Sequence, residues 1–271
     1  MKEFKNKTAV VTGAGSGIGR ALASRCAEEG MNIAIADVQP ARLESLREAL
    51  ATTGARVLCA ELDVADAADQ QAFARDCIET FGTPALLFNN AGILRVGNAW
   101  SHPGGEWERI FSINVLGVVN GINAFLPSML DRGEPAHIIN TGSVGSLVAA
   151  PGMAQYTATK MAVRGITETL AYDLAAKGAP IDVSLLCPGP VLTSISDDLL
   201  GIEPGDGSSE HLMAGQPGFI TAEDCASRVF AAIAERRFWI FTHPFNDYLR
   251  EKMDAIVRGE YPSYSEVVFD A

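Results

Sequence analysis

Residues that bind metals or form disulfides are few and scattered in this sequence. The 271 residues include four histidines and five cysteines, and none of them falls into a C-x-x-C or H-E-x-x-H pattern. A metal site is therefore not expected. An odd, dispersed set of cysteines is typical of a reduced protein in the cytoplasm, which is the location we expect. The cysteines are Cys26, Cys59, Cys77, Cys187 and Cys225.

Positive charge and long hydrophobic runs are also lacking. Lys and Arg number 21 against 33 Asp and Glu, which gives a net charge of −12. Nucleic acids and anionic membranes are bound through Lys and Arg, so we expect neither as a partner, although backbone N–H groups could still form a local phosphate site. No apolar run is long enough to predict a membrane span. The charged start of the chain has no apolar segment behind it, so no secretory signal is expected.

Short apolar segments alternate with helical segments along the chain. The apolar segments lack strict alternation, which is typical of strands buried on both faces of a parallel sheet. Strands are expected at 8–11, 32–36, 56–62, 85–88, 137–140, 181–186 and 238–241, and helices at 18–29, 40–52, 65–81, 106–131, 153–177 and 222–235. This order predicts one α/β domain over residues 1–271, a doubly wound (Rossmann) fold with a seven-stranded parallel sheet flanked by helices on both faces.

Two segments fall outside this alternation. Residues 195–218 form a long irregular stretch, and such stretches in compact domains are usually lids or binding loops, less often disordered. We expect a substrate lid loop. Residues 244–271 form a C-terminal extension, in which one more helix is expected before an apolar end at 267–269.

A glycine-rich turn follows the first expected strand and precedes a helix. Its spacing is G-x-x-x-G-x-G, with glycines at Gly13, Gly17 and Gly19 and with Ser16 and Ile18 between them. Glycines let the backbone approach a pyrophosphate closely, and the helix N-terminus supplies free N–H donors. The alternative is a tight turn that only packs the helix on the sheet, but that role would not need so many glycines.

Acids and amides follow the neighbouring strands. Asp37 ends the second strand, where a carboxylate can accept hydrogen bonds from both hydroxyls of an adenosine ribose. Ligands of doubly wound sheets bind at this edge, so a dinucleotide site is expected. Turn formation and helix capping are the alternative roles. The other candidates at this edge are Asp63, Val64, Asn90, Ala91 and Gly92.

Tyr156 and Lys160 have the i, i+4 spacing that places two residues on one face of a helix. The spacing alone is a weak signal, since Tyr248 and Lys252 share it. Tyr156, however, follows a strand that ends close to Ser143 on the ligand edge, whereas Tyr248 lies in the C-terminal extension. The first pair is therefore the candidate for chemistry.

Together these motifs resemble those of the short-chain dehydrogenase/reductase family, in its shorter single-domain branch. The matching segments are T-G-x-x-x-G-x-G at 12–19, N-N-A-G at 89–92, Asn114, Ser143, Y-x-x-x-K at 156–160 and P-G-x-x-x-T at 188–193. The resemblance covers residues 7 to about 242. It implies an oxidoreductase, and it leaves 195–218 and 244–271 without a shared motif.

The resemblance also implies roles for individual residues. Tyr156 would be the general acid/base, and Ser143 would hydrogen-bond to the substrate oxygen. Asn114 would hold a water on a proton path to Lys160, although Asn114 could also bond to backbone, and Lys160 would hold the nicotinamide ribose. The remaining implied cofactor contacts are Asp63 and Val64 at the adenine, and Val191 and Thr193 at the carboxamide in the segment that Pro188 and Gly189 begin.

The expected reaction moves a hydride between nicotinamide and the carbon of a secondary alcohol or its ketone. A tyrosine pKa of about 10 is too high for a base near neutral pH, but a cation about 4 Å away could bring it near 7, and we expect Lys160 to be that cation. NAD is expected rather than NADP, because Asp37 would repel a 2′-phosphate and the next basic residue is Arg42. Arg20 and Arg42 are the nearest basic candidates to meet a 2′-phosphate, and the alternative is that both lie on solvated helix surfaces.

The stretch from 144 to 153 is apolar and is expected to form the substrate wall. Neither it nor 195–218 contains Arg or Lys, which favours an apolar or aromatic alcohol or ketone over a phosphorylated or carrier-bound one. The expected wall residues are Val144, Leu147, Val148, Ala149, Ala150, Pro151 and Met153.

Two expected helices, 106–131 and 153–177, are apolar on more than one face. A surface helix needs one apolar stripe, so the surplus predicts a helix-pair interface and a homodimer or homotetramer. The residues that carry it are Phe111, Val115, Val118, Val119, Ile122, Phe125, Met161, Val163, Ile166 and Leu170.

Two other functions remain open. A catalytically silent dinucleotide-binding sensor or scaffold would need no proton relay, so the complete set of Asn114, Ser143, Tyr156 and Lys160 argues against it. A methyltransferase with a glycine-rich loop on a similar sheet would have no use for Tyr156 and Lys160.

Overall fold

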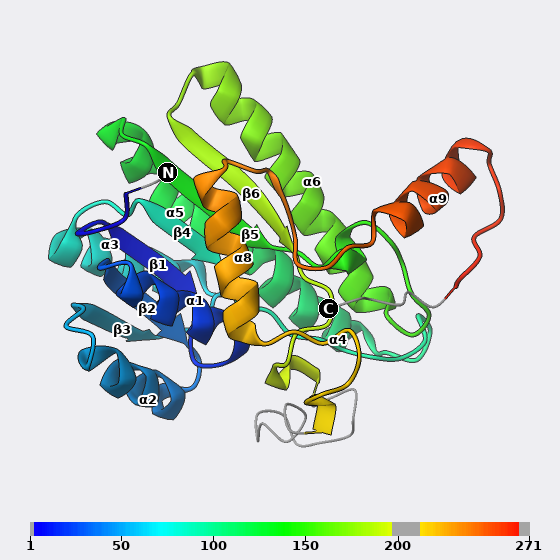
Figure 1. Cartoon of the computed structure of the whole chain (residues 1–271), viewed down its shortest axis with the longest axis horizontal. Coiled ribbons are helices and arrows are strands. Elements are labelled where there is room, and N and C mark those ends of the chain that lie inside the picture. Colours follow the sequence, from blue (N-terminus) through cyan, green and yellow to red (C-terminus); the bar gives the residue numbers. More distant parts are fainter. Residues whose placement is uncertain (1–2, 197–211, 266–271) are drawn as a thin grey trace.

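The computed structural model describes residues 3–196 and 212–265, which fold around one parallel sheet (Figure 1). The strands lie in the order β3-β2-β1-β4-β5-β6-β7, and all six neighbouring pairs are parallel. The strands are β1 (Thr8–Thr12), β2 (Asn32–Asp37), β3 (Val57–Glu61), β4 (Leu86–Asn89), β5 (Ala136–Thr141), β6 (Ile181–Cys187) and β7 (Trp239–Phe241). The predicted doubly wound sheet is confirmed, and its switch point lies between β1 and β4.

Helices cover both faces of the sheet. One hydrophobic cluster joins the sheet to α1 (Gly17–Glu28), α2 (Pro40–Ala51) and α8 (Ala222–Ala234), and α8 lies in front of the sheet in Figure 1. A second cluster joins the opposite face to α3 (Ala67–Phe81), α5 (Gly117–Arg132) and α6 (Ala154–Lys177). Because both faces are buried, the strands carry apolar residues in continuous runs.

The long helix predicted at 106–131 is interrupted. It consists of α4 (Gly104–Phe111), a π-helical turn (Ser112–Leu116) and α5. Asn114 lies in this turn, and its amide bonds to both the N–H and the C=O of Ile93, at 2.9 Å each. A π turn inserts an extra residue in the helix and often marks a functional site.

The combined helix Gly104–Arg132 is, within the described part of the chain, the single helix long and apolar enough to cross a membrane. Half of its most apolar window is buried inside the protein. Phe125 and Met129 of α5, for example, are completely buried. This burial is typical of a core helix.

The predicted lid lies mostly outside the described residues, which omit 197–211. The segments on either side of this gap meet, because Val191 forms a bridge with Ile220 and the N–H of Leu192 donates to the Ile220 carbonyl at 2.9 Å. The stretch that begins at Thr193 therefore starts and ends at one place, beside the carboxyl ends of the strands.

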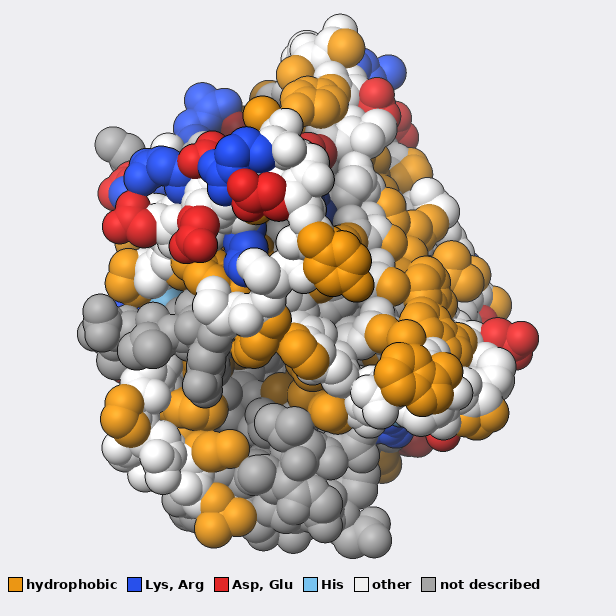
Figure 2. Space-filling view, turned by 90° about the vertical axis from the view of Figure 1, so that its right-hand side faces the viewer, with side chains coloured by type: hydrophobic (Ala, Val, Ile, Leu, Met, Phe, Trp, Pro, Cys, Tyr) orange, Lys and Arg blue, Asp and Glu red, His pale blue; other side chains and the backbone are white. Residues whose placement is uncertain are grey.

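The C-terminal extension contains α9 (Asn246–Val257), which lies away from the sheet in Figure 1. None of the residues in this described helix is buried, and Val257 is 87% exposed. Figure 2 looks onto this side of the molecule and shows hydrophobic side chains gathered in a broad band. The predicted apolar end at 267–269 lies outside the described residues.

Candidate active site

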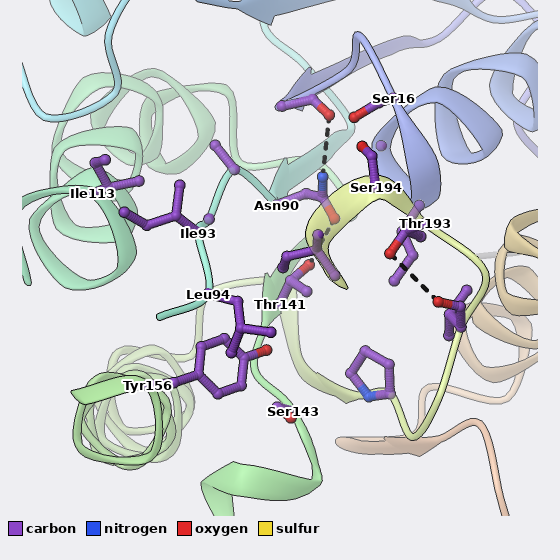
Figure 3. Close-up of a pocket in the computed structure, with 18 of the residues that line it drawn as sticks. Ser16, Asn90, Ile93, Leu94, Ile113, Thr141, Ser143, Tyr156, Thr193 and Ser194 are labelled. Carbon is purple, nitrogen blue, oxygen red and sulfur yellow. Dashed lines mark hydrogen bonds between the residues drawn. The ribbon is translucent and has the colours of Figure 1, made fainter. Parts of the chain in front are cut away.

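A cavity of about 560 Å³ runs along the carboxyl ends of the strands. Asp37 and Asp63 line one end, and Ser143 and Tyr156 line the other (Figure 3 shows the second pair). Most of the predicted cofactor residues line this cavity. They are Gly13, Ser16, Ile18, Gly19, Asp37, Asp63, Val64, Asn90, Ala91, Gly92, Tyr156, Lys160, Pro188, Gly189, Val191 and Thr193.

Gly17 is the predicted cofactor residue that does not line the cavity, and it shapes the turn instead. It has a φ of +48°, and a Cβ at this position would lie 2.7 Å from Cγ2 of Thr193. Any side chain would therefore be strained by its backbone and would collide with the Pro188–Thr193 segment. The glycine lets the turn after β1 touch the segment after β6, so both line one cavity at the N-terminus of α1. Backbone this close to a helix N-terminus fits the pyrophosphate of a dinucleotide.

The side chain of Asp37 is hydrogen-bonded to the glycine-rich turn. Its Oδ2 accepts a hydrogen bond of 2.9 Å from the N–H of Gly15, and its Oδ1 accepts one of 3.0 Å from Gln39. Arg42 lines the cavity next to this carboxylate and is partly buried. Of the two alternatives for Arg42, the structure favours a position at the cavity over a solvated helix surface, because the first turn of α2 carries its side chain to the cavity.

Asp63 forms an ion pair that the sequence does not predict. Its Oδ2 lies 2.9 Å from Nη1 of Arg109 on α4, and its Oδ1 accepts from the N–H of Ala65 at 3.0 Å. Partial burial raises the pKa of Asp63, but these two contacts outweigh it and leave the pKa below its usual value. Asp63 is thus a carboxylate at the far end of the cavity.

Asn90 joins the ends of three strands. Its Nδ2 donates to the carbonyl of Thr12 at 3.1 Å, and its Oδ1 accepts from the hydroxyl of Thr141 at 3.3 Å. Asn90 therefore has a structural role, since it ties the strand ends together, and it also lines the cavity (Figure 3).

Ser143, Tyr156 and Lys160 converge at the other end. Ser143 follows β5 and caps the next turn, accepting from the N–H of Gly145 at 3.1 Å. Nζ of Lys160 lies 5.5 Å from the centroid of the Tyr156 ring and donates to the carbonyl of Thr141 at 2.8 Å. Lys160 is 3% exposed, so the ammonium lies beneath the cavity floor rather than in solvent.

Gly92 makes room for this arrangement. A Cβ there would lie 3.5 Å from Nζ of Lys160 and 3.3 Å from Oδ1 of Asn114. Nδ2 of Asn114 also donates to the hydroxyl of Thr159 at 3.1 Å. The Asn114 side chain thus bonds to the Ile93 backbone and to Thr159, which agrees with the alternative that Asn114 bonds to backbone.

The expected low pKa of Tyr156 is not found in the protein alone. Desolvation raises the pKa of Tyr156 above its usual value, and a hydrogen bond with Ser143 offsets this only in part. Desolvation also lowers the pKa of Lys160 to about 8. Both groups are buried, and the Lys160 ammonium lies over the face of the ring and bonds to Thr141. Desolvation is therefore the largest influence on the pKa of each group.

The predicted substrate wall is largely wrong. Among the described residues that line the cavity, Met153 is the only one from that wall. Ser143 caps a tight turn at Val144–Ser146, which directs Leu147 into a core cluster with Val118 and Val163. Leu94, Ile195 and Phe219 supply apolar lining instead, and Arg95 and Arg109 add two cations. Arg95 lies three residues after the end of the N-N-A-G motif, so its nearness to the site is a signal that the sequence did offer.

The second Tyr–Lys pair has similar geometry in a different place. Nζ of Lys252 lies 5.0 Å from the ring centroid of Tyr248, but both residues are on α9, where Lys252 donates to the carbonyl of Ser263. Among the described residues, neither lines the cavity.

The chain is similar to known proteins over nearly its whole length. The family model for short chain dehydrogenases matches residues 7–200. A CLA biosynthesis dehydrogenase/reductase from Lactiplantibacillus plantarum is 34% identical over 277 residues, with 97% of each chain covered. A 1-deoxy-11-beta-hydroxypentalenate dehydrogenase from Streptomyces avermitilis is 36% identical over 238 residues, covering 87% of this chain and 84% of the relative.

A solved structure resembles the whole fold. The short chain dehydrogenase/reductase from Burkholderia phymatum, determined in complex with NAD, superposes with a TM-score of 0.90 at 38% identity. The match covers 99% of this chain and 100% of that one. The similarity therefore extends through α9, beyond the segment that the family model matches.

Proposed function

This chain belongs to the short-chain dehydrogenase/reductase family, and from that premise we propose that it is an NAD-dependent oxidoreductase acting on a secondary alcohol or its ketone. The observation that carries the proposal is the convergence of Ser143, Tyr156 and Lys160 on one end of a cavity whose other end is lined by Asp37 and Asp63. When bound, NAD accepts or returns the hydride. The chain's own residues supply orientation and proton handling.

NAD is the cofactor that this cavity favours. The Burkholderia phymatum structure was determined with NAD, and Asp37 offers a carboxylate to the ribose end of the site. A carboxylate accepts hydrogen bonds from a free ribose diol and repels a 2′-phosphate. Arg42, which lines the cavity beside Asp37, is the group that opposes this preference.

Tyr156 is the proposed proton donor and acceptor. The phenol and the Ser143 side chain line the same end of the cavity, so both hydroxyls could contact one substrate oxygen. Ser143 would stabilise charge that develops on that oxygen. Lys160 lies one helical turn further and would favour the phenolate once the cofactor's charge and the substrate complete the site.

Asn114 is proposed to support proton transfer to Lys160 through its place in the fold. Its side chain bonds to the Ile93 backbone and to Thr159, which leaves the backbone of the π turn as the part that could hold a water near Lys160. We propose this as the form in which Asn114 contributes.

The substrate proposed is an apolar or aromatic secondary alcohol or ketone. Leu94, Met153 and Phe219 give the reacting end apolar walls, and apolar walls favour an apolar skeleton. The Streptomyces relative is named as the dehydrogenase of an alcohol, which fits this reaction class.

A homodimer or homotetramer in the cytoplasm completes the proposal. Five of the ten residues expected to form its interface are buried inside the monomer, including Phe125 and Val163. Leu116, Met161 and Tyr172 are instead exposed on the same helices, by 51%, 41% and 69%. A sedimentation experiment that finds only monomer at micromolar concentration would contradict the oligomer.

Absorbance at 340 nm tests the proposal, with NAD, a panel of secondary alcohols and the purified chain. Reduction of NAD by at least one apolar alcohol is expected. Saturable NAD binding without any turnover would instead favour the catalytically silent sensor.

A further inference from the structure

A buried histidine behind the cavity joins two of the segments that line it. His243 follows the end of β7 and is 3% exposed. Its Nδ1 lies 2.8 Å from the hydroxyl of Thr242, and its Nε2 lies 3.0 Å from the carbonyl of Gly218. Among the residues that the structure describes, neither His243 nor Thr242 lines the cavity. Any effect of this pair on a ligand must therefore pass through the segments that it holds.

The direction of these hydrogen bonds follows from their partners. A carbonyl only accepts, so Nε2 of His243 carries a proton and donates to Gly218. Burial lowers the pKa of His243, an effect that the bond to Gly218 opposes and the charge of Arg228 reinforces. The ring is then neutral at pH 7, and Nδ1 accepts from the Thr242 hydroxyl, whose oxygen accepts the N–H of Gly189 at 3.0 Å. One chain of hydrogen bonds thus runs from Gly189 to Gly218.

The Gly189 end of this chain of bonds adjoins the reacting groups. The carbonyl of Pro188 accepts a 3.0 Å hydrogen bond from the N–H of Val144, the residue after Ser143. A Cβ at Gly189 would lie 2.6 Å from Nδ1 of His243, so the absence of a side chain lets the backbone pack against the ring. Because Pro188 and Gly189 both line the cavity, the imidazole supports the cavity wall from behind.

The Gly218 end supports an apolar part of the wall. Gly218 precedes Phe219, which lines the cavity. The next residue, Ile220, donates to the carbonyl of Pro190 at 3.2 Å and accepts from the N–H of Leu192 at 2.9 Å. The two segments are therefore joined twice, once by these backbone bonds and once through the imidazole.

We propose that His243 is a positioning residue for the nicotinamide end of the site: through Thr242 it fixes the backbone of Gly189 against the nicotinamide, and through Gly218 it fixes Phe219 against the substrate. This rests on the proposed function and extends it to residues outside the cavity. The alternative is a buried, hydrogen-bonded histidine that only stabilises the fold. Such a histidine would affect both ends of the cavity alike.

Two ligands that differ at one end test the inference on the intact chain. NAD and ADP-ribose share the adenosine diphosphate part, but only NAD has the nicotinamide, so titrations with both separate the two ends without any turnover. Thr242→Val removes the hydroxyl between Gly189 and the imidazole and nearly keeps the side-chain shape. It should weaken NAD binding by about tenfold and leave ADP-ribose binding within about threefold of the native chain.

Two variants of His243 separate its two bonds. His243→Ala loses both, so it should weaken NAD binding as Thr242→Val does. In His243→Asn the shorter amide can still accept from the Thr242 hydroxyl but does not reach Gly218. This variant should restore NAD binding to within about threefold of the native chain, while its KM for the alcohol stays raised by about threefold or more.

The control is His137→Gln, which removes another buried histidine, hydrogen-bonded to the hydroxyl of Ser184. His137 is not among the described residues that line the cavity, so the ratio of the NAD and ADP-ribose affinities should not change.

The inference is overturned if Thr242→Val and His243→Ala weaken both ligands alike or neither, or if His243→Asn binds NAD no better than His243→Ala. A native chain that binds NAD but turns over no alcohol would overturn the proposed function, while the titrations would still decide the role of His243. A native chain that binds neither NAD nor ADP-ribose would overturn both.

Discussion

The N–H of Gly15 donates a 2.9 Å hydrogen bond to Oδ2 of Asp37, so the acid that ends β2 is fixed against the turn that follows β1. This contact aims a carboxylate at the ribose end of the cavity. The carboxylate would repel a 2′-phosphate, whereas the hydroxyls of a free ribose diol can donate hydrogen bonds to it. We therefore expect the preference for NAD to depend on this one side chain, held by one backbone group.

Replacing Asp37 tests that dependence. The native chain should prefer NAD over NADP by at least about a hundredfold in kcat/KM, because the lost hydrogen bonds are worth about 1.5–3 kcal/mol each and roughly 1.4 kcal/mol gives tenfold. Asp37→Ala should erode the preference, and Val38→Arg should move it further toward NADP. Steady-state kinetics with both cofactors and one alcohol measure the effect.

Arg42 provides the matched comparison. It lines the cavity beside Asp37, so in the Asp37→Ala background it should be the residue that supports NADP. Adding Arg42→Ala to Asp37→Ala should remove most of the gain with NADP. Equal efficiency of both cofactors in the native chain would mean that Asp37 does not contact the ribose.

The pKa of Tyr156 predicts opposite pH profiles for the two directions. Desolvation raises this pKa, so the phenol is protonated at neutral pH before the cofactor binds. Alcohol oxidation needs the phenolate and should become faster as pH rises, whereas ketone reduction needs the phenol and should fall at high pH. Plots of kcat/KM against pH in both directions check this, and an oxidation rate that falls from pH 7 to 9 would contradict it.

The contact between Gly17 and Thr193 predicts a cofactor-binding defect. Gly17→Ala adds a methyl group that would lie 2.7 Å from Cγ2 of Thr193 at a φ of +48°. The turn or the Pro188–Thr193 segment must then move, so the KM for NAD should rise by about tenfold or more, from a displacement worth roughly 1.4 kcal/mol. Gly105→Ala is the control, since nothing lies within 4 Å of its added Cβ, and it should leave this KM unchanged.

His137 predicts an acid-sensitive sheet. Its Nε2 lies 2.7 Å from the Ser184 hydroxyl, which itself donates to the carbonyl of Arg237, so Nε2 carries the proton. Nδ1 has no partner among the described atoms, and burial lowers the pKa of His137 to about 4. The unfolded chain binds a proton with a pKa of about 6.5, so stability should fall as pH drops below that value.

Urea unfolding at two pH values measures this effect. Between pH 7.5 and 5.0 the shift should cost about 2 kcal/mol of unfolding free energy. His137→Gln should lose most of this pH dependence, whereas His102→Gln, outside the sheet, should keep it. An unchanged slope in His137→Gln would show that His137 does not cause the loss.

The sheet was predictable from sequence because buried parallel strands leave continuous apolar runs. All seven strands begin and end within one residue of their expected bounds. The helix 65–81 starts two residues late, at Ala67, because the side chain of Asp66 caps it by accepting from the N–H groups of Ala68 and Asp69. The sequence predicts such a cap poorly when the residues before it also fit a helical pattern, as at 65–66.

Other features depend on contacts between distant segments. The π turn at Ser112–Leu116 is matched to the Ile93 backbone through Asn114, and nothing local to 106–131 predicts that partner. Leu147 turns into the core because Ser143 caps the preceding turn, which removes the expected wall. Arg109 on α4 forms an ion pair with Asp63. The hydrophobic periodicity of each segment does not show that these two segments lie side by side.

The most direct test of the account is Tyr156→Phe. The phenol oxygen is the atom proposed to move the proton, while the ring that lies over Lys160 is retained. NAD binding measured by titration should stay within about threefold of the native chain, and kcat for alcohol oxidation at 340 nm should fall by two to four orders of magnitude, the range typical of a lost general acid/base. A variant that binds NAD normally and turns over at near-native kcat would contradict the central claim.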